Sequence, residues 1–66
     1  MAKYDLYVGG DCISEHNTWE TADKAFNEAV EQYPDMDIDI LSDDGEISYK
    51  SYDPDTQEIY DSEVHL

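Results

Sequence analysis

The chain has 66 residues and a formal net charge of −15, because 18 acidic residues stand against three lysines and no arginine. This length predicts one domain, residues 1–66, with a thin hydrophobic core. The charge argues against direct binding to nucleic acid or to anionic membranes, since both are bound through Lys and Arg. A single cysteine excludes an intramolecular disulfide, and no apolar run approaches the roughly 20 residues of a membrane span.

The first eight residues contain an alternating segment that predicts a half-buried strand over 3–8. Gly9 and Gly10 predict a turn, and 12–16 is expected to return as a short second strand. The side chains expected to face the core are Tyr4, Leu6 and Val8. Asp5 and Tyr7 are expected on the opposite face.

A helix is predicted next, beginning after Thr18 as N-cap and ending before Pro34. Apolar residues recur in it at spacings of three and four, as on one face of an amphipathic helix. They are Trp19, Ala22, Phe26, Ala29, Val30 and Tyr33.

Three further strands are expected over 35–41, 46–52 and 58–65. Asp44-Gly45 and the 53–57 segment predict the hairpin turns between them. The residues expected on the core side are Met36, Ile38, Ile40, Ile47, Tyr49, Tyr60, Val64 and Leu66. In the last strand, Ile59, Asp61 and Glu63 are expected to point outward.

The predicted fold class is therefore α+β. A single helix packs on one face of a four- or five-stranded antiparallel sheet, in the order strand, a possible second strand, helix and three strands. One helix covers only one face of such a sheet, so the other face is left to water or to a partner.

Acidic residues gather on the uncovered face and at the hairpin tips of this fold, and the partners they fit are basic. The candidate partner-binding residues are Asp5, Tyr7, Asp37, Asp39, Asp43, Asp44, Glu46, Asp53, Asp55, Asp61 and Glu63. Tyr7 could serve as an anchor, because tyrosine is enriched at binding hot spots.

The spacing of Asp35, Asp37, Asp39 and Glu46 matches positions one, three, five and twelve of a calcium-binding EF-hand loop. Position six, which requires glycine, is Ile40. A strand would also set the three aspartates in a row about 6.7 Å apart. We therefore expect no metal and no cofactor.

Cys12 and His16 are candidates for a nucleophile and a base. On a regular strand their spacing of four would place them on one face but about 13 Å apart, beyond hydrogen-bonding distance. We expect a protein that is not an enzyme. The first six residues do not resemble a signal peptide, which with the lone thiol favours the cytoplasm of a bacterial cell.

In size, charge and lack of catalytic residues the whole chain resembles the small acidic inhibitors carried by phages and mobile elements. These include anti-CRISPR proteins, anti-restriction proteins and uracil-DNA glycosylase inhibitors. The resemblance implies a nucleic-acid mimic that binds the basic surface of a nucleic-acid-binding enzyme or guide-RNA complex. A regulatory module of the antitoxin or anti-sigma type, and a halophilic domain, are the alternatives. A monomer and a homodimer are both compatible with the sequence.

Overall fold

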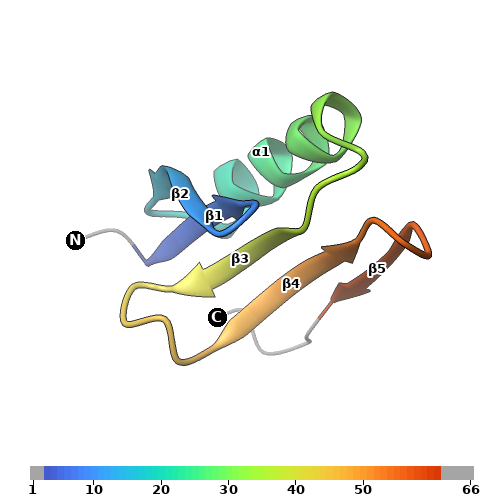
Figure 1. Ribbon diagram of the computed structural model, residues 1–66. Coiled ribbons are helices and arrows are strands. Elements are labelled where there is room, and N and C mark those ends of the chain that lie inside the picture. Colours follow the sequence, from blue (N-terminus) through green and yellow to red (C-terminus); the bar gives the residue numbers. More distant parts are fainter. Residues whose placement is uncertain (1–2, 62–66) are drawn as a thin grey trace.

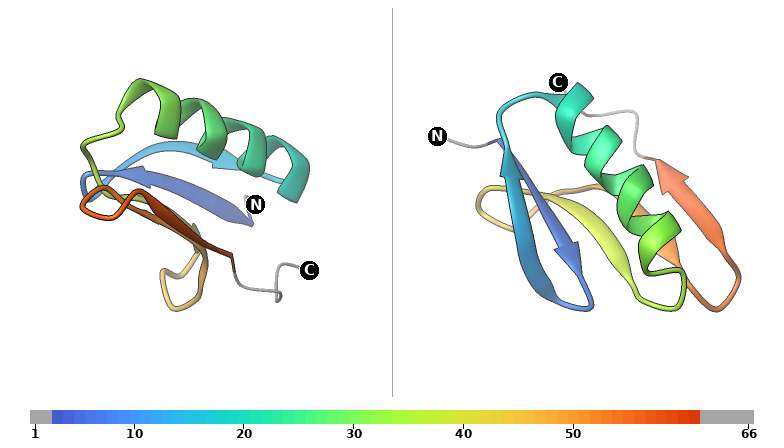
Figure 2. Two further views of the ribbon diagram at one scale, coloured as in Figure 1. Left: turned by 90° about the vertical axis from the view of Figure 1, so that its right-hand side faces the viewer. Right: turned by 90° about the horizontal axis from the view of Figure 1, so that it is seen from above.

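A computed structural model of the protein describes residues 3–61. Its elements are β1 (Tyr4–Val8), β2 (Asp11–His16), α1 (Trp19–Gln32), β3 (Ile38–Ser42), β4 (Ser48–Asp53) and β5 (Glu58–Asp61). The strands form one antiparallel sheet in the order β2-β1-β3-β4-β5. Helix α1 lies on one face of this sheet, and no other helix or strand of residues 3–61 covers the opposite face (Figures 1 and 2). The predicted α+β fold is confirmed, including the short second strand.

The central strands β1 and β3 supply most of the core, because each buries every second side chain. The helix adds one stripe to it. The buried apolar residues are Tyr4, Leu6, Val8, Ala22, Phe26, Ala29, Ile38, Ile40 and Tyr52. The predicted inward sets of the first strand and of the helix are thus confirmed in their main members, and Trp19 and Val30 pack against them.

Helix α1 begins and ends as the sequence predicts. The Thr18 hydroxyl accepts a hydrogen bond from the Thr21 N–H at 3.3 Å, which satisfies one free amide of the first turn. At the other end the Tyr33 N–H donates to the Ala29 carbonyl, and Pro34 follows. The Tyr52 hydroxyl donates to the Pro34 carbonyl at 2.8 Å, which ties β4 to the helix exit.

Four described residues predicted for the core are exposed, three of them before the last strand. Tyr33 is the C-cap of α1 and is 40% exposed. Met36 precedes β3, which begins at Ile38, and is 41% exposed. Ile47 lies in the loop between β3 and β4 and is 46% exposed, because this loop spans five residues and leaves Ile47 outside the ladder.

A β-bulge at Tyr49 changes the alternation of β4. Ile40 pairs with Lys50 whereas Leu41 pairs with Ser48, so Tyr49 is the additional residue. Its ring contacts those of Tyr4 and Trp19 edge to face, at centroid distances of 5.1 and 6.3 Å. The predicted inward position of Tyr49 is correct, and the bulge places Lys50 on the same side.

The predicted orientation of the last strand is wrong. Tyr52 pairs with Ile59, and Ser51 pairs with Tyr60. Because Tyr52 is buried under the helix side of the sheet, Ile59 and Asp61 lie on that side and Tyr60 lies on the other. A shift of one residue inverts every side chain of a strand. The expectations for Glu63, Val64 and Leu66 lie outside the described residues.

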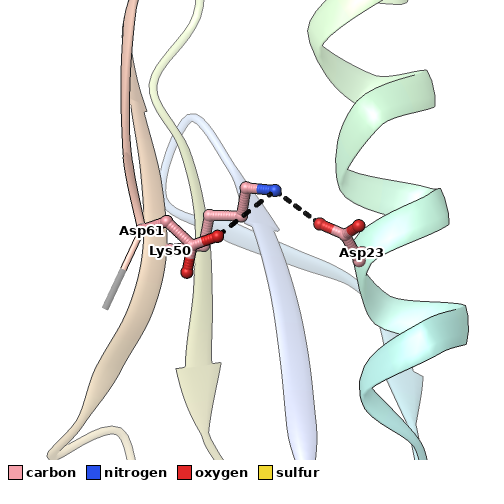
Figure 3. Close-up of polar contacts among 3 residues, drawn as sticks. All are labelled: Asp23, Lys50 and Asp61. Atoms are coloured by element: carbon pink, nitrogen blue, oxygen red, sulfur yellow. Dashed lines mark hydrogen bonds and ion pairs between the residues drawn. The ribbon is translucent and has the colours of Figure 1, made fainter. Parts of the chain in front are cut away.

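Lys50 is a charged residue of β4 that faces α1 (Figure 3). Its ammonium group forms an ion pair with Asp23 of the helix at 2.5 Å and lies 3.9 Å from Asp61 of β5. It also lies 5.0 Å from the centroid of the Phe26 ring. Only 11% of the Lys50 side chain is exposed, so its methylene stem fills the space beside the core.

Replacing Lys50 by alanine is expected to destabilise the protein by about 1–2 kcal/mol, because the stem packing, the cation–π contact and the ion pair are lost together. Lys50→Met keeps most of the stem and should lose less than alanine does. Urea denaturation of both variants measures the difference. Equal stability of Lys50→Ala and the wild type would show that this contact contributes nothing.

Candidate partner-binding face

We call the side of the sheet opposite α1 the open face. One row of paired side chains crosses it. Tyr7 of β1 pairs with Asp39 of β3, Asp39 pairs with Ser51 of β4, and Ser51 pairs with Tyr60 of β5. Cys12 of β2 extends the row beyond Tyr7. Each of these residues alternates with a side chain on the helix side. The row therefore places a carboxylate between two tyrosines.

Two pairs of like charges flank this row on the open face. Asp5 of β1 lies opposite Glu15 of β2, and Asp53 of β4 lies opposite Glu58 of β5. Directly opposed like charges destabilise a sheet, by roughly 0.2–1 kcal/mol a pair. Neither pair has a described cation between its members. The open face is thus electrostatically unfavourable in the free protein.

Asp5 carries a second cost, the burial of a polar atom without a hydrogen bond. One of its carboxylate oxygens, Oδ1, is buried and has no hydrogen-bond partner. Beside it, partial burial and the charges of Asp5 and Glu15 raise the pKa of the Cys12 thiol. Cys12 is exposed but remains protonated at neutral pH, which makes it a poor nucleophile.

A hollow of about 430 Å³ opens on this face. The residues that line it are Gly10, Asp37, Asp39, Ser51, Tyr52, Asp53 and Tyr60. Gly10 and Ser51 have little or no side chain, which explains the depression. A side chain at Gly10 would meet no atom within 4 Å. The lining therefore includes three carboxylates and two tyrosines, of which Tyr60 is exposed and Tyr52 is buried.

Two residues that line the hollow, Asp39 and Tyr60, have raised pKa values. Burial, and secondly the charge of Asp37, raise the pKa of the half-buried Asp39 carboxyl. The Tyr60 hydroxyl donates a hydrogen bond to Glu58 Oε2 at 3.1 Å. This bond, and then the charges of Glu58 and Asp53, raise the pKa of Tyr60. Burial is the main cause of the raised pKa of Asp39, and the hydrogen bond to Glu58 is the main cause of the raised pKa of Tyr60; neighbouring negative charges add to both.

Asp39→Asn is expected to stabilise the protein at neutral pH by about 0.5 kcal/mol, a small effect because solvent screens a half-exposed carboxylate. The raised pKa means that folded Asp39 holds its proton at a pH where the unfolded chain has lost it. Its ionisation therefore reduces stability as the pH rises through the folded pKa. The advantage of the variant should vanish below about pH 3.9. Urea denaturation at both pH values tests this, and no gain at neutral pH would contradict it.

Asp44 is hydrogen-bonded within the loop between β3 and β4. Its carboxylate accepts hydrogen bonds from the Ser42 hydroxyl at 2.5 Å and from the Glu46 N–H at 3.0 Å. These bonds, in that order, lower the pKa of Asp44. Asp44 thus shapes the loop between β3 and β4 and is engaged within it.

The remaining predicted residues are scattered. Asp43 and Glu46 lie in the same loop as Asp44, and Asp55 lies in the turn between β4 and β5. Asp61 lies on the helix side, near Lys50. Glu63 lies outside the described residues. The structure therefore brings together Asp5, Tyr7, Asp37, Asp39 and Asp53 on the open face.

Several residues of the open face were not predicted as site residues; among them are Cys12, Glu15, Ser51, Glu58 and Tyr60. Glu15 and Glu58 belong to the two outermost strands, whose registers the sequence leaves open. Tyr60 was expected on the opposite side. A correct pairing of Tyr52 with Ile59 would have located both Glu58 and Tyr60.

Residues 3–61 form neither of the two other sites considered from the sequence, a metal site and a Cys12–His16 pair. Within residues 3–61, no group of three or more His, Cys, Asp or Glu side chains could hold a metal ion. A bulge at Ile13 places Cys12 opposite Tyr7 and His16 opposite Tyr4. The expectation that Cys12 and His16 share one face is therefore wrong. His16 instead contacts the Ser14 hydroxyl, with Nε2 at 2.8 Å.

No protein family, curated protein or solved structure matches this chain. In the part of the chain between residues 3 and 61, no helix combines the length and the apolar character that crossing a bilayer requires.

Proposed function

We propose that this protein is an acidic nucleic-acid mimic that binds the nucleic-acid-binding surface of a host defence or DNA-processing enzyme, or of a guide-RNA complex, and thereby inhibits it. The observation that supports this most is the open face, where carboxylates from all five strands lie around two tyrosines and no helix or strand of residues 3–61 covers them (Figure 2).

Strand geometry gives this face a high density of charge. Neighbouring strands lie about 4.8 Å apart, and side chains on one face of a strand repeat about every 6.7 Å. Duplex DNA carries one negative charge per roughly 1.7 Å of its axis. A sheet face with carboxylates on adjacent strands offers a basic groove a comparable array of anions. Its net charge also accelerates association with a basic partner at low salt.

The cost of this face in the free protein also supports the proposal. The pairs Asp5–Glu15 and Asp53–Glu58 place like charges opposite each other, which solubility alone does not require. Cations of a partner would offset the repulsion on binding. Residues that reduce stability without a local benefit are typical of functional surfaces.

Affinity capture from a bacterial lysate tests the proposal when it is made with matched variants. Asp39→Asn/Asp53→Asn removes two charges from the open face, and Glu28→Gln/Glu31→Gln removes two from exposed positions of α1. We expect the wild type and the helix variant to retain a nucleic-acid-binding protein that elutes as salt increases. The open-face variant should retain much less of it.

Equal retention by the two double variants would contradict the open face as the binding site. A retained protein that binds no nucleic acid would instead favour the regulatory module. Failure of the wild type to fold at low salt would favour the halophilic domain.

A further inference from the structure

The hollow of the open face differs from the rest of that face in being concave and partly aromatic. Its lining includes the small residues Gly10 and Ser51 together with Tyr60, which is 53% exposed. The hydrogen bond from the Tyr60 hydroxyl to Glu58 holds the phenol in place. A flat array of phosphate-like charges would need no such depression.

We infer that this hollow receives one arginine side chain of the basic partner; the inference rests on the proposed function. Charge complementarity selects a cation, because Asp37, Asp39 and Asp53 line the hollow and no described cation lies among them. Lys50, the lysine nearest in sequence, is on the helix side of the sheet and is paired with Asp23.

The shape and chemistry of the hollow favour arginine over lysine. A guanidinium group is planar, presents five donors and forms paired hydrogen bonds with carboxylates. It also stacks on aromatic rings and is more weakly hydrated than an ammonium group. Asp39 and Asp53 supply the carboxylates, and Tyr60 supplies the ring. A lysine would gain the charge interaction but neither the paired hydrogen bonds nor the stacking.

Titration with two peptides of equal charge tests this inference. Hexa-arginine and hexa-lysine are added separately to the ¹⁵N-labelled protein at low salt, and amide shifts are recorded by NMR. We expect hexa-arginine to bind about threefold to tenfold more tightly, with its largest shifts at Asp39, Ser51 and Tyr60.

Variants that fill the hollow without changing charge sharpen the test. Ser51→Leu adds volume to the lining of the hollow, whereas Ser48→Leu adds the same volume at an exposed position of the same strand that does not line it. Ser51→Leu should reduce hexa-arginine affinity to the level of hexa-lysine, and Ser48→Leu should leave it unchanged. If Ser51→Leu fails to fold, the comparison of the two peptides on the wild type still decides.

The outcomes separate the two proposals. Equal affinities for the two peptides, with shifts spread over the open face, would overturn the arginine hollow and support an acidic face that binds by charge alone. Shifts confined to α1 or to the loops would overturn the arginine hollow and the open-face site together. Absence of binding by either peptide at low salt would contradict the proposed function itself.

Discussion

Reversing two charges on the open face, Asp37→Lys and Asp39→Lys, is expected to weaken binding to a captured basic partner by at least about 100-fold, or roughly 2.7 kcal/mol. Each change removes an attraction and introduces a repulsion, and like charges across an interface cost several kcal/mol. Folding should persist, because Asp37 is exposed and Asp39 lies on the side of β3 opposite the core. Biolayer interferometry measures the affinity.

The matched control is Glu28→Lys/Glu31→Lys, which makes the same change in net charge on the exposed side of α1. This variant should lose far less affinity, because only long-range attraction is reduced. Circular dichroism of both variants verifies folding. An equal loss in the two variants would mean that net charge alone, and no particular face, determines binding.

Replacing Phe26 by alanine is expected to remove about 3–5 kcal/mol of stability. Phe26 is fully buried and lies between the helix and the central strands. At about 0.05–0.15 kcal/mol per residue, a 66-residue domain has only about 3–10 kcal/mol in total, so the variant should be largely unfolded. Far-ultraviolet circular dichroism and urea denaturation report this loss.

Tyr33→Ala is the control for that prediction, since Tyr33 is 40% exposed at the end of α1. Its cost should stay below about 1 kcal/mol. A Phe26→Ala variant that unfolds at the same urea concentration as Tyr33→Ala would contradict the helix-on-sheet core.

Alternation and helix signals in the sequence predicted the parts of the fold with one buried face. Tyr4, Leu6 and Val8 alternate without interruption, and the structure buries all three. Thr18 marks the start of α1 because its side chain accepts a hydrogen bond from a free amide of the first turn. Pro34 marks the end because proline has no backbone N–H to donate. These signals are local and do not depend on strand pairing.

The last two strands could not be predicted to the same extent, because their orientation depends on pairing. The bulge at Tyr49 shifts the parity of β4, and no glycine marks it. In β5, adjacent Ile59 and Tyr60 are both apolar, so alternation does not choose between them. The bulge places Lys50 on the helix side, where Asp23, distant in sequence, compensates its charge.

The residues of the open face could be predicted from the sequence at its centre but not at its edges, for the same reason. Asp5, Tyr7 and Asp39 follow directly from alternation in β1 and β3. Glu15 and Glu58 depend on the registers of the two edge strands. The concavity arises from Gly10 and Ser51, which belong to different hairpins. A hollow of this kind appears only when the strands are assembled.

Displacement of the protein from its captured partner by duplex DNA tests the central claim most directly. The partner is immobilised with the protein bound, and duplex DNA of about 20 base pairs is added at constant salt. A mimic and DNA compete for one basic surface, so we predict that DNA releases the protein in proportion to its own occupancy of that surface. A ternary complex, in which DNA binds while the protein stays bound, would contradict nucleic-acid mimicry.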